Sequence, residues 1–379
     1  MFSKTFLKGA AALLMVLPLA GCGWFSSSDP HEPAELQDFK PAVMAKISWS
    51  ADVGENSGYL TPAVTDNAVY AAGGDELVRL DRGTGAKVWT AKTEGNVTAG
   101  VGSDGSYAAV VSGEGGLEVF SPEGKRLWKE TLSAETDVPP LVGHGMVVVR
   151  TADTRVTAFE ASSGKVLWRY QGQAPSLSLQ AFKQMAWSPA GILIGESNGR
   201  LLALGPQGKP TFDLLVAQAH GITEVERLSD VVGRAWVDAQ MMCASAFQGG
   251  IMCMDATNGR MLWRAKVDAV SGPVADSQFV YVVDADSRVH AFNRQNGREA
   301  WVNSELLYRR VSAPIRIGAT VAVADYEGYV TLMHPDTGRV VGRTRLDGAV
   351  RSAPQQSSYG AVYETADGQV AYVLQDTLE

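Results

Sequence analysis

Residues 80–89 read LDRGTGAKVW, and the same pattern returns as FEASSGKVLW at residues 159–168 and as MDATNGRMLW at residues 254–263. Weaker copies complete the series, and the tryptophan position of the eight copies falls at Trp49, Trp89, Trp128, Trp168, Phe212, Trp263, Trp301 and Gly342. Successive positions lie 38 to 51 residues apart. A period of about 40 residues is typical of propeller blades and of other stacked repeats. The chain therefore contains eight copies of one structural unit.

Each repeat has the sequence pattern of four short β-strands separated by turns. In one copy, apolar runs at residues 190–195 and 200–204 flank the turn sequence Glu-Ser-Asn-Gly. Short apolar or alternating runs between Gly, Asp and Asn indicate strands and hairpins, and no segment keeps a long helical period. Four strands in about 40 residues make one propeller blade. We therefore predict an all-β fold, an eight-bladed β-propeller of four-stranded blades.

The two ends of the chain predict how the ring closes. The last repeat stops after residues 370–374 and lacks its tryptophan strand, whereas residues 44–51, around Trp49, supply such a strand without the upstream half of a repeat. We expect this first strand to complete the last blade, which leaves the ring without an open end. The propeller is predicted to span residues 43–379.

The first 21 residues have the features of a bacterial lipoprotein signal peptide. Lys4 and Lys8 form a positive region, and the apolar run at residues 9–19 is shorter than the roughly 20 residues of a membrane-spanning helix. Residues 19–22 read Leu-Ala-Gly-Cys, which is a lipobox. We therefore predict that residues 1–21 are removed and that Cys22 is lipidated, since several acyl chains on one residue anchor a protein stably.

The residues that follow the cysteine bear on location and on partners. Gly23 stands where lipoproteins retained in the inner membrane carry an aspartate, so we expect an outer-membrane lipoprotein that faces the periplasm. Residues 22–42 contain few core-forming runs and are predicted to be the lipidated N-terminus and a flexible tether. The chain has a net charge of −8, which disfavours nucleic acid as a partner because phosphate binding needs a basic face.

The sequence offers no catalytic, cofactor-binding or metal-binding motif. Residues 100–105 match G-x-G-x-x-G, but no helix follows to hold a pyrophosphate. The five histidines are scattered without metal-ligand spacing. Residues 195–199 match Gly-x-Ser-x-Gly, but they lie at the predicted hairpin turn between two short strands and not at the strand-to-helix elbow of hydrolases. We therefore predict a protein that binds other proteins, is not an enzyme and carries no cofactor.

The repeat, with Asp, Thr or Ser, Gly and Trp at fixed spacing, resembles the tryptophan-docking repeat of pyrroloquinoline-quinone (PQQ) enzymes, which also occurs in proteins without that cofactor. Residues 175–179 (PSLSL) and 223–231 (TEVERLSDV) resemble the signature loops of the BamB family, the lipoproteins of the bacterial outer-membrane β-barrel assembly machine. The resemblance runs from the lipobox to the last strand. It implies a scaffold that helps to deliver or orient unfolded outer-membrane proteins.

The same resemblance implies a partner and its contact residues. In the family, the two loops contact the central, BamA-type barrel subunit through its periplasmic POTRA domains, alongside other barrel-assembly lipoproteins. Carried over to this chain, the contacts fall on Leu177, Leu179 and Asp230. Gln180 stands where the family often has an arginine, and Val232 stands where a second aspartate is common, so the chain departs from the family pattern at two polar positions. Exposed leucines are best explained by a partner that covers them.

The lengths of the connectors between repeats point to the same loops. The two longest connectors follow Trp168 and Phe212, are consecutive, and contain the two signature loops. Equivalent connectors emerge on one face of a propeller, so we expect these two to be neighbours on one rim, where loops commonly carry binding sites. Two other functions remain as alternatives, a periplasmic PQQ-dependent dehydrogenase, whose adjacent cysteine pair this chain lacks, and a structural envelope-binding propeller.

Cys243 and Cys253 flank the turn sequence Ala-Phe-Gln-Gly-Gly at residues 246–250. A three-residue loop pairs Ala246 with Gly250 and brings the two cysteines opposite each other, whereas a two-residue loop sends them to opposite faces. We favour the first register. Within it, a disulfide formed after export and two buried free thiols both stay open, and we favour the free thiols.

Overall fold

Every regular element in the described part of the chain is a β-strand. The computed structural model describes residues 31–56, 58–173, 183–218, 223 and 228–378. Among these residues, no helix is long and apolar enough to cross a membrane. Residues 33–379 form one compact unit, to which the following description applies, and residues 1–32 are a separate unit.

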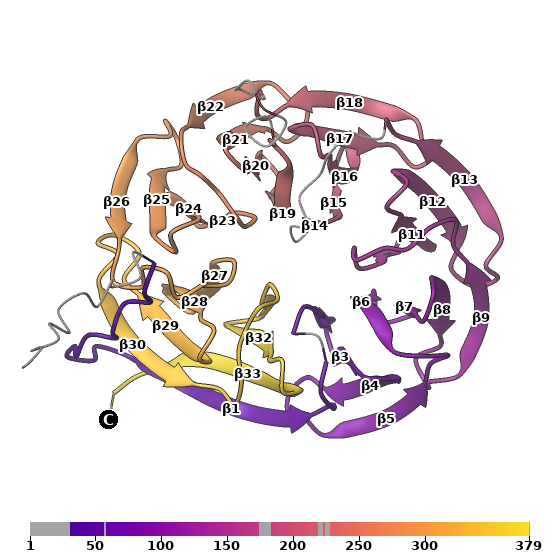
Figure 1. Cartoon of the computed structure of the whole chain (residues 1–379), viewed down its shortest axis with the longest axis horizontal. Coiled ribbons are helices and arrows are strands. Elements are labelled where there is room, and N and C mark those ends of the chain that lie inside the picture. The colour runs from indigo at the N-terminus through magenta and orange to yellow at the C-terminus, as the bar shows by residue number, and fades with distance from the viewer. Residues whose placement is uncertain (1–30, 57, 174–182, 219–222, 224–227, 379) are drawn as a thin grey trace, which may run out of the picture. The chain divides into compact units, whose positions relative to one another are not determined.

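The strands form eight sheets that stand as blades around a central axis (Figure 1). Blade 1 contains β2 (Ala63–Val64), β3 (Ala68–Gly73), β4 (Glu76–Asp81) and β5 (Lys87–Lys92). Blade 2 contains β6 (Val97–Ser103), β7 (Ala108–Ser112), β8 (Gly116–Phe120) and β9 (Arg126–Thr131). Blade 3 contains β10 (Leu141–Gly143), β11 (Met146–Arg150), β12 (Arg155–Glu160) and β13 (Val166–Gln171). Blade 4 contains β15 (Ala186–Ser188), β16 (Gly191–Gly195), β17 (Arg200–Leu204) and β18 (Pro210–Leu215).

The second half of the ring follows the same plan. Blade 5 contains β19 (Val231–Val237), β20 (Met241–Ala246), β21 (Gly250–Asp255) and β22 (Met261–Ala265), with β14 (Lys183–Gln184) added at its inner edge. Blade 6 contains β23 (Val274–Ala275), β24 (Phe279–Val283), β25 (Val289–Asn293) and β26 (Glu299–Asn303). Blade 7 contains β27 (Ile315–Ile317), β28 (Thr320–Ala324), β29 (Tyr329–Met333) and β30 (Val340–Arg345). Blade 8 contains β31 (Gln355–Ser357), β32 (Gly360–Glu364), β33 (Gln369–Asp376) and β1 (Met44–Asp52).

Blade 8 closes the ring as the sequence predicts. β1 pairs antiparallel with β33, from Met44 opposite Asp376 to Asp52 opposite Gln369. The first strand of the propeller therefore becomes the outermost strand of its last blade, and in Figure 1 the indigo β1 lies beside the yellow β33. The predicted eight-bladed propeller is confirmed, with one addition, because blade 5 has a fifth strand.

The repeated glycine and tryptophan join each blade to the next. The indole nitrogen of Trp49 donates a hydrogen bond to the carbonyl of Arg82 at 2.9 Å, and that of Trp89 donates to the carbonyl of Pro122 at 2.7 Å. Gly85 lies against the Trp49 ring, where an added Cβ would come within 2.5 Å of a ring atom. Its φ of 72° also lies in the left-handed region that favours glycine. Contact between blades therefore explains the spacing of the repeat.

Apolar clusters fill the spaces between neighbouring blades. Tyr70 and Leu77 of blade 1, for example, pack in one buried cluster with Val110 and Phe120 of blade 2. Each of the four side chains is at most 1% exposed. Burial of this kind contributes on the order of 25 cal/mol per Å² of apolar surface, so the ring is stabilised mainly where blades meet.

The segment before β1 packs on blade 7. The backbone nitrogen of Ala34 donates to the carbonyl of Leu307 at 2.9 Å, and Arg343 donates to the carbonyl of Gln37 at 3.2 Å. The Arg343 guanidinium also lies 5.0 Å from the centre of the Phe39 ring. The part of the expected tether from Ala34 onward thus makes specific contacts with the propeller.

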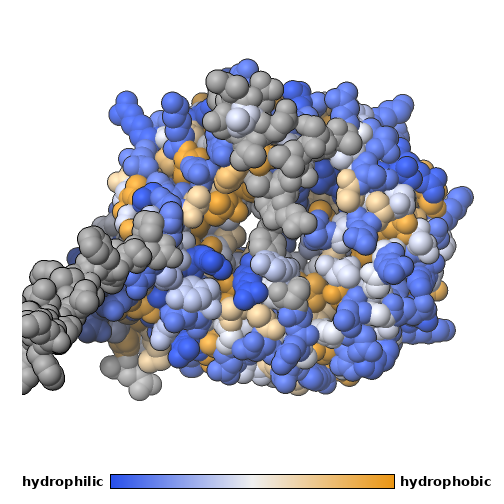
Figure 2. Space-filling model, in the orientation of Figure 1, coloured by the Kyte–Doolittle hydropathy of each residue, from blue (hydrophilic) through white to orange (hydrophobic). Residues whose placement is uncertain are grey.

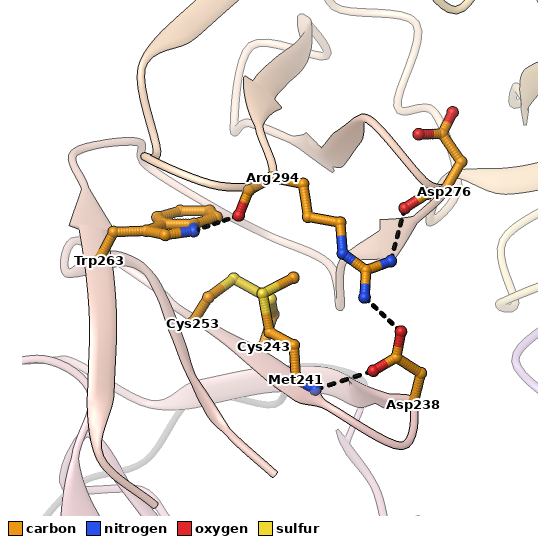
Figure 3. Close-up of a disulfide and its surroundings, with 7 residues drawn as sticks. All are labelled: Asp238, Met241, Cys243, Cys253, Trp263, Asp276 and Arg294. Carbon is orange, nitrogen blue, oxygen red and sulfur yellow. Dashed lines mark hydrogen bonds and ion pairs between the residues drawn. A yellow bond between two sulfur atoms is a disulfide. The ribbon is translucent and has the colours of Figure 1, made fainter.

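The turn between β20 and β21 has the register that we favour, since Ala246 pairs with Gly250. The expectation of free thiols is wrong, because Cys243 and Cys253 form a disulfide (Figure 3). The two residues face each other across the strand pair with their Cα atoms 4.1 Å apart, and both side chains are fully buried. At this close spacing, two thiols on the same face of a sheet meet directly.

Candidate functional site

The two long connectors of the propeller are joined by β-pairing. β14, at the end of the connector that follows β13, runs parallel to β19, which begins after the next connector. Lys183 lies opposite Gly233, and Gln184 lies opposite Arg234. In the part of the chain that the structure describes, the ends of the two connectors are therefore neighbours, as predicted. The pairing itself was missed, because a two-residue strand carries no periodic signal in the sequence.

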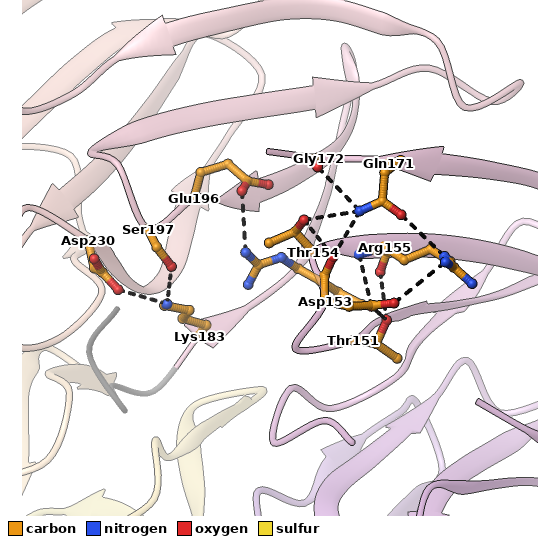
Figure 4. Close-up of polar contacts among 11 residues, drawn as sticks. Thr151, Asp153, Thr154, Arg155, Gln171, Gly172, Lys183, Glu196, Ser197 and Asp230 are labelled. Atoms are coloured by element: carbon orange, nitrogen blue, oxygen red, sulfur yellow. Dashed lines mark hydrogen bonds and ion pairs between the residues drawn. The ribbon is translucent and has the colours of Figure 1, made fainter. Parts of the chain in front are cut away.

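A buried ion pair reinforces this junction (Figure 4). The ammonium group of Lys183 lies 2.9 Å from Oδ2 of Asp230, and it also donates to the hydroxyl of Ser197 at 2.8 Å. The Lys183 side chain is 10% exposed and that of Asp230 is 0% exposed. Lys183, at the end of the first connector, thus contacts both the β16–β17 turn of blade 4 and the residue that precedes β19.

A second ion pair links the same turn to blade 3. Arg150, the last residue of β11, lies 3.3 Å from Glu196, which precedes Ser197 in the β16–β17 turn. Both side chains are nearly buried, at 8% and 11% exposure. Burial raises the pKa of Glu196, although Arg150 favours the charged form of the carboxyl. Two consecutive residues of one turn, Glu196 and Ser197, therefore link blade 4 to blade 3 and to the inner strand β14 of blade 5.

The predicted contact residues fall into two groups. Leu177, Leu179 and Gln180 lie outside the described residues. Asp230 is described, and its carboxylate is buried and directed at Lys183. Val232, at the position where the family often has a second aspartate, is 1% exposed and belongs to a buried apolar cluster.

Sequence reasoning did not find Lys183 or Ser197. Ser197 was assigned only to a hairpin turn, and a single lysine before a short strand is not distinguished from any surface lysine. The described part of the site can therefore position the two connectors, through one strand pair and two ion pairs. In the described ranges, no group of three or more His, Cys, Asp or Glu side chains is arranged to hold a metal ion.

Comparison with known sequences identifies relatives along the whole chain. The family model described as outer membrane protein assembly factor BamB matches residues 73–303. The chain is 36% identical to the outer membrane protein assembly factor BamB of Bordetella pertussis over 372 residues, covering 97% of this chain and 96% of the relative. It is 38% identical to the protein of the same name from Burkholderia pseudomallei over 373 residues, covering 97% of each chain. These relatives are named as assembly factors and not as enzymes.

Comparison with solved structures gives the same result. The crystal structure of BamB from Moraxella catarrhalis superimposes with a TM-score of 0.80 at 25% identity, covering 87% of this chain and all of that one. Quinohemoprotein alcohol dehydrogenase from Comamonas testosteroni gives a TM-score of 0.66 at 13% identity, covering 90% of this chain and 78% of that one, a likeness that shows the fold alone. With a matching family model and relatives that align from end to end, the chain belongs to the BamB family of outer membrane protein assembly factors.

Proposed function

We propose that this protein is a non-catalytic scaffold of the outer-membrane β-barrel assembly machinery. It is anchored in the outer membrane through lipids on Cys22 and faces the periplasm. The two long connectors between blades 3, 4 and 5 bind the POTRA domains of the central barrel subunit. In that position the propeller assists the assembly and insertion of outer-membrane β-barrel proteins.

The parallel pairing of β14 with β19 is the observation that carries this proposal. It places the ends of two connectors side by side on a rigid ring, and loops fixed on a rigid scaffold are common binding sites. Leu177 and Leu179 supply the apolar contacts in this proposal. Asp230 acts as a positioning residue, because its carboxylate is buried against Lys183.

Site-specific photo-crosslinking in outer membranes tests the contact. A photoreactive amino acid is placed at Leu179, and in a matched control at Leu167, which lies on the outermost strand of blade 3 and is 46% exposed. We expect a crosslink to the central barrel subunit from position 179 and none from position 167. Equal crosslinking from both positions, or none from position 179, contradicts the proposed surface.

A further inference from the structure

A cavity of about 1090 Å³ lies at the axis of the ring. Its walls include the inner strands of blades 4 to 8, which are β15, β19, β23, β27 and β31. Figure 2 shows the opening at the centre of the ring. A cavity of this volume is large enough for a small organic ligand or for a short stretch of polypeptide.

Four arginines line this cavity. Arg234 lies in β19, Arg310 in the connector between β26 and β27, Arg316 in β27, and Arg351 just before β31. All four side chains are exposed to solvent. Within the described residues, none of them forms a salt bridge with an acidic side chain. Two strands and two connectors thus place four arginines without acidic partners among the described residues along one cavity.

The acidic residues of the lining do not offset this charge, because each already has a cationic partner. Asp238 is paired with Arg294, and Asp284 lies 3.1 Å from Arg288 and 2.9 Å from His290. The chain as a whole has a net charge of −8. The excess positive charge of the cavity is therefore a local feature, opposite in sign to the charge of the protein.

The environment of the arginines favours an anionic ligand. Arg234 reaches solvent inside the cavity, but the surrounding walls still lower the pKa of its guanidinium, because enclosure disfavours the charged form. A cation that is incompletely hydrated and lacks a counter-charge gains from an anion placed beside it. Tyrosine rings flank the charges, since Tyr59 and Tyr359 are 53% and 83% exposed and the Arg351 guanidinium lies 5.9 Å from the centre of the Tyr59 ring.

We propose that the central cavity binds an acidic polypeptide segment. Arg234 and Arg316 come from blades 5 and 7, Arg310 and Arg351 come from the connectors before blades 7 and 8, and each guanidinium can take a carboxylate in bidentate fashion. β15, β23, β27 and β31 are each the end strand of their sheet, so their inner edges offer backbone groups to an extended chain. Binding in the cavity goes beyond the proposed contact at the two connectors and does not depend on it.

Fluorescence anisotropy with a labelled peptide rich in Asp and Tyr tests the proposal on the purified mature chain. We expect binding that weakens by at least about tenfold in the double variant Arg234→Gln/Arg316→Gln. The matched control is Arg169→Gln/Arg260→Gln, which removes two exposed arginines from the outer part of the ring and should leave affinity unchanged. Absence of binding to the native chain, or equal loss in both double variants, overturns the proposal.

Two further measurements distinguish a bound peptide from a small polycarboxylate and the cavity from the connectors. Citrate at the same carboxylate concentration should not displace the peptide, and complete displacement would assign the cavity to small polycarboxylates and overturn the peptide assignment. Crosslinking from position 179 to the central barrel subunit should persist in the Arg234→Gln/Arg316→Gln variant. Because the two assays respond to different variants, failure of the cavity proposal and failure of the connector proposal can be told apart.

Discussion

The ammonium group of Lys183 and the carboxylate of Asp230 lie 2.9 Å apart, in a contact almost closed to solvent that joins two connectors of the propeller. The family resemblance points to Asp230 as a residue that meets the partner. Its carboxylate is buried against Lys183, so we expect it to fix the start of β19 against the first connector. We therefore expect binding by the two leucines and positioning by Asp230 to be separable.

Breaking this pair should destabilise the protein. Lys183→Met leaves the Asp230 carboxylate buried without its ammonium partner, and the removal of one member of a buried pair costs about 3 kcal/mol of unfolding free energy. The double variant Lys183→Met/Asp230→Leu should lose less than the sum of the two single variants. Chemical denaturation of all four proteins measures this coupling.

An exposed ion pair provides the control for that experiment. Lys46 and Asp376 lie 3.1 Å apart at 52% and 42% exposure, so Lys46→Met should change stability little. If Lys183→Met lowered the unfolding free energy as little as Lys46→Met, the junction between the connectors would not depend on the ion pair.

The disulfide should be present in the exported protein and should stabilise blade 5. In Figure 3, Cys243 and Cys253 are joined on neighbouring strands beside Trp263. Cys243→Ala/Cys253→Ala should fold and lose about 2–3 kcal/mol, because the bridge closes a short loop. Mass spectrometry of unreduced, alkylated peptides provides the chemical check. Two alkylated thiols in protein taken directly from the periplasm would rule the bridge out.

Stability should fall with rising pH because of Glu364. Its side chain is buried at the end of β32, where Oε1 accepts a hydrogen bond from Asn56 at 2.9 Å, and burial raises its pKa well above the ordinary value of 4.5. The folded state therefore holds a proton that the unfolded state releases. The stability that the protonated Glu364 carboxyl contributes is fully present below pH 4.5, and it is lost as the pH rises towards the folded-state pKa.

Denaturation at pH 5 and at pH 8 tests this assignment. Glu364→Gln keeps an acceptor for Asn56 and cannot ionise, so its stability relative to the native chain should increase from pH 5 to pH 8. The control Glu130→Gln changes an exposed carboxylate on β9 and should show no such trend. A pH-independent difference for Glu364→Gln would show that the carboxyl is not protonated in the folded protein.

The predicted anchor is tested by Cys22→Ser, which removes the only sulfur that the lipobox offers. We expect an uncleaved or unlipidated protein that incorporates no labelled palmitate and leaves the outer-membrane fraction. Cys243→Ala/Cys253→Ala serves as the control, because it removes the two other cysteines and should still incorporate palmitate. Palmitate incorporation by Cys22→Ser would show that the lipobox is wrongly assigned.

The sequence predicts the fold well because a single contact repeats along the chain. Each Trp of the repeat packs against a Gly of the next blade, as Trp49 and Gly85 show, so the two residues recur at a fixed spacing. The junction of the connectors has no such repetition. Lys183 meets Asp230 across 47 positions of the chain, and nothing near either residue specifies the other. Loop lengths could place the two connectors on one rim, but the pairing depends on tertiary contacts alone.

The decisive measurement for the proposed contact is the affinity of the purified chain for the isolated POTRA domains of the central barrel subunit. Three proteins are compared, the native chain, Leu177→Glu/Leu179→Glu, and the control Val88→Glu/Leu167→Glu, which places the same charges on outer strands at residues 51% and 46% exposed. We expect the connector variant to lose binding while its thermal melt stays close to that of the native chain, and the control to bind normally. Native affinity in the connector variant, or equal loss in both variants, would contradict the proposed binding through the connectors.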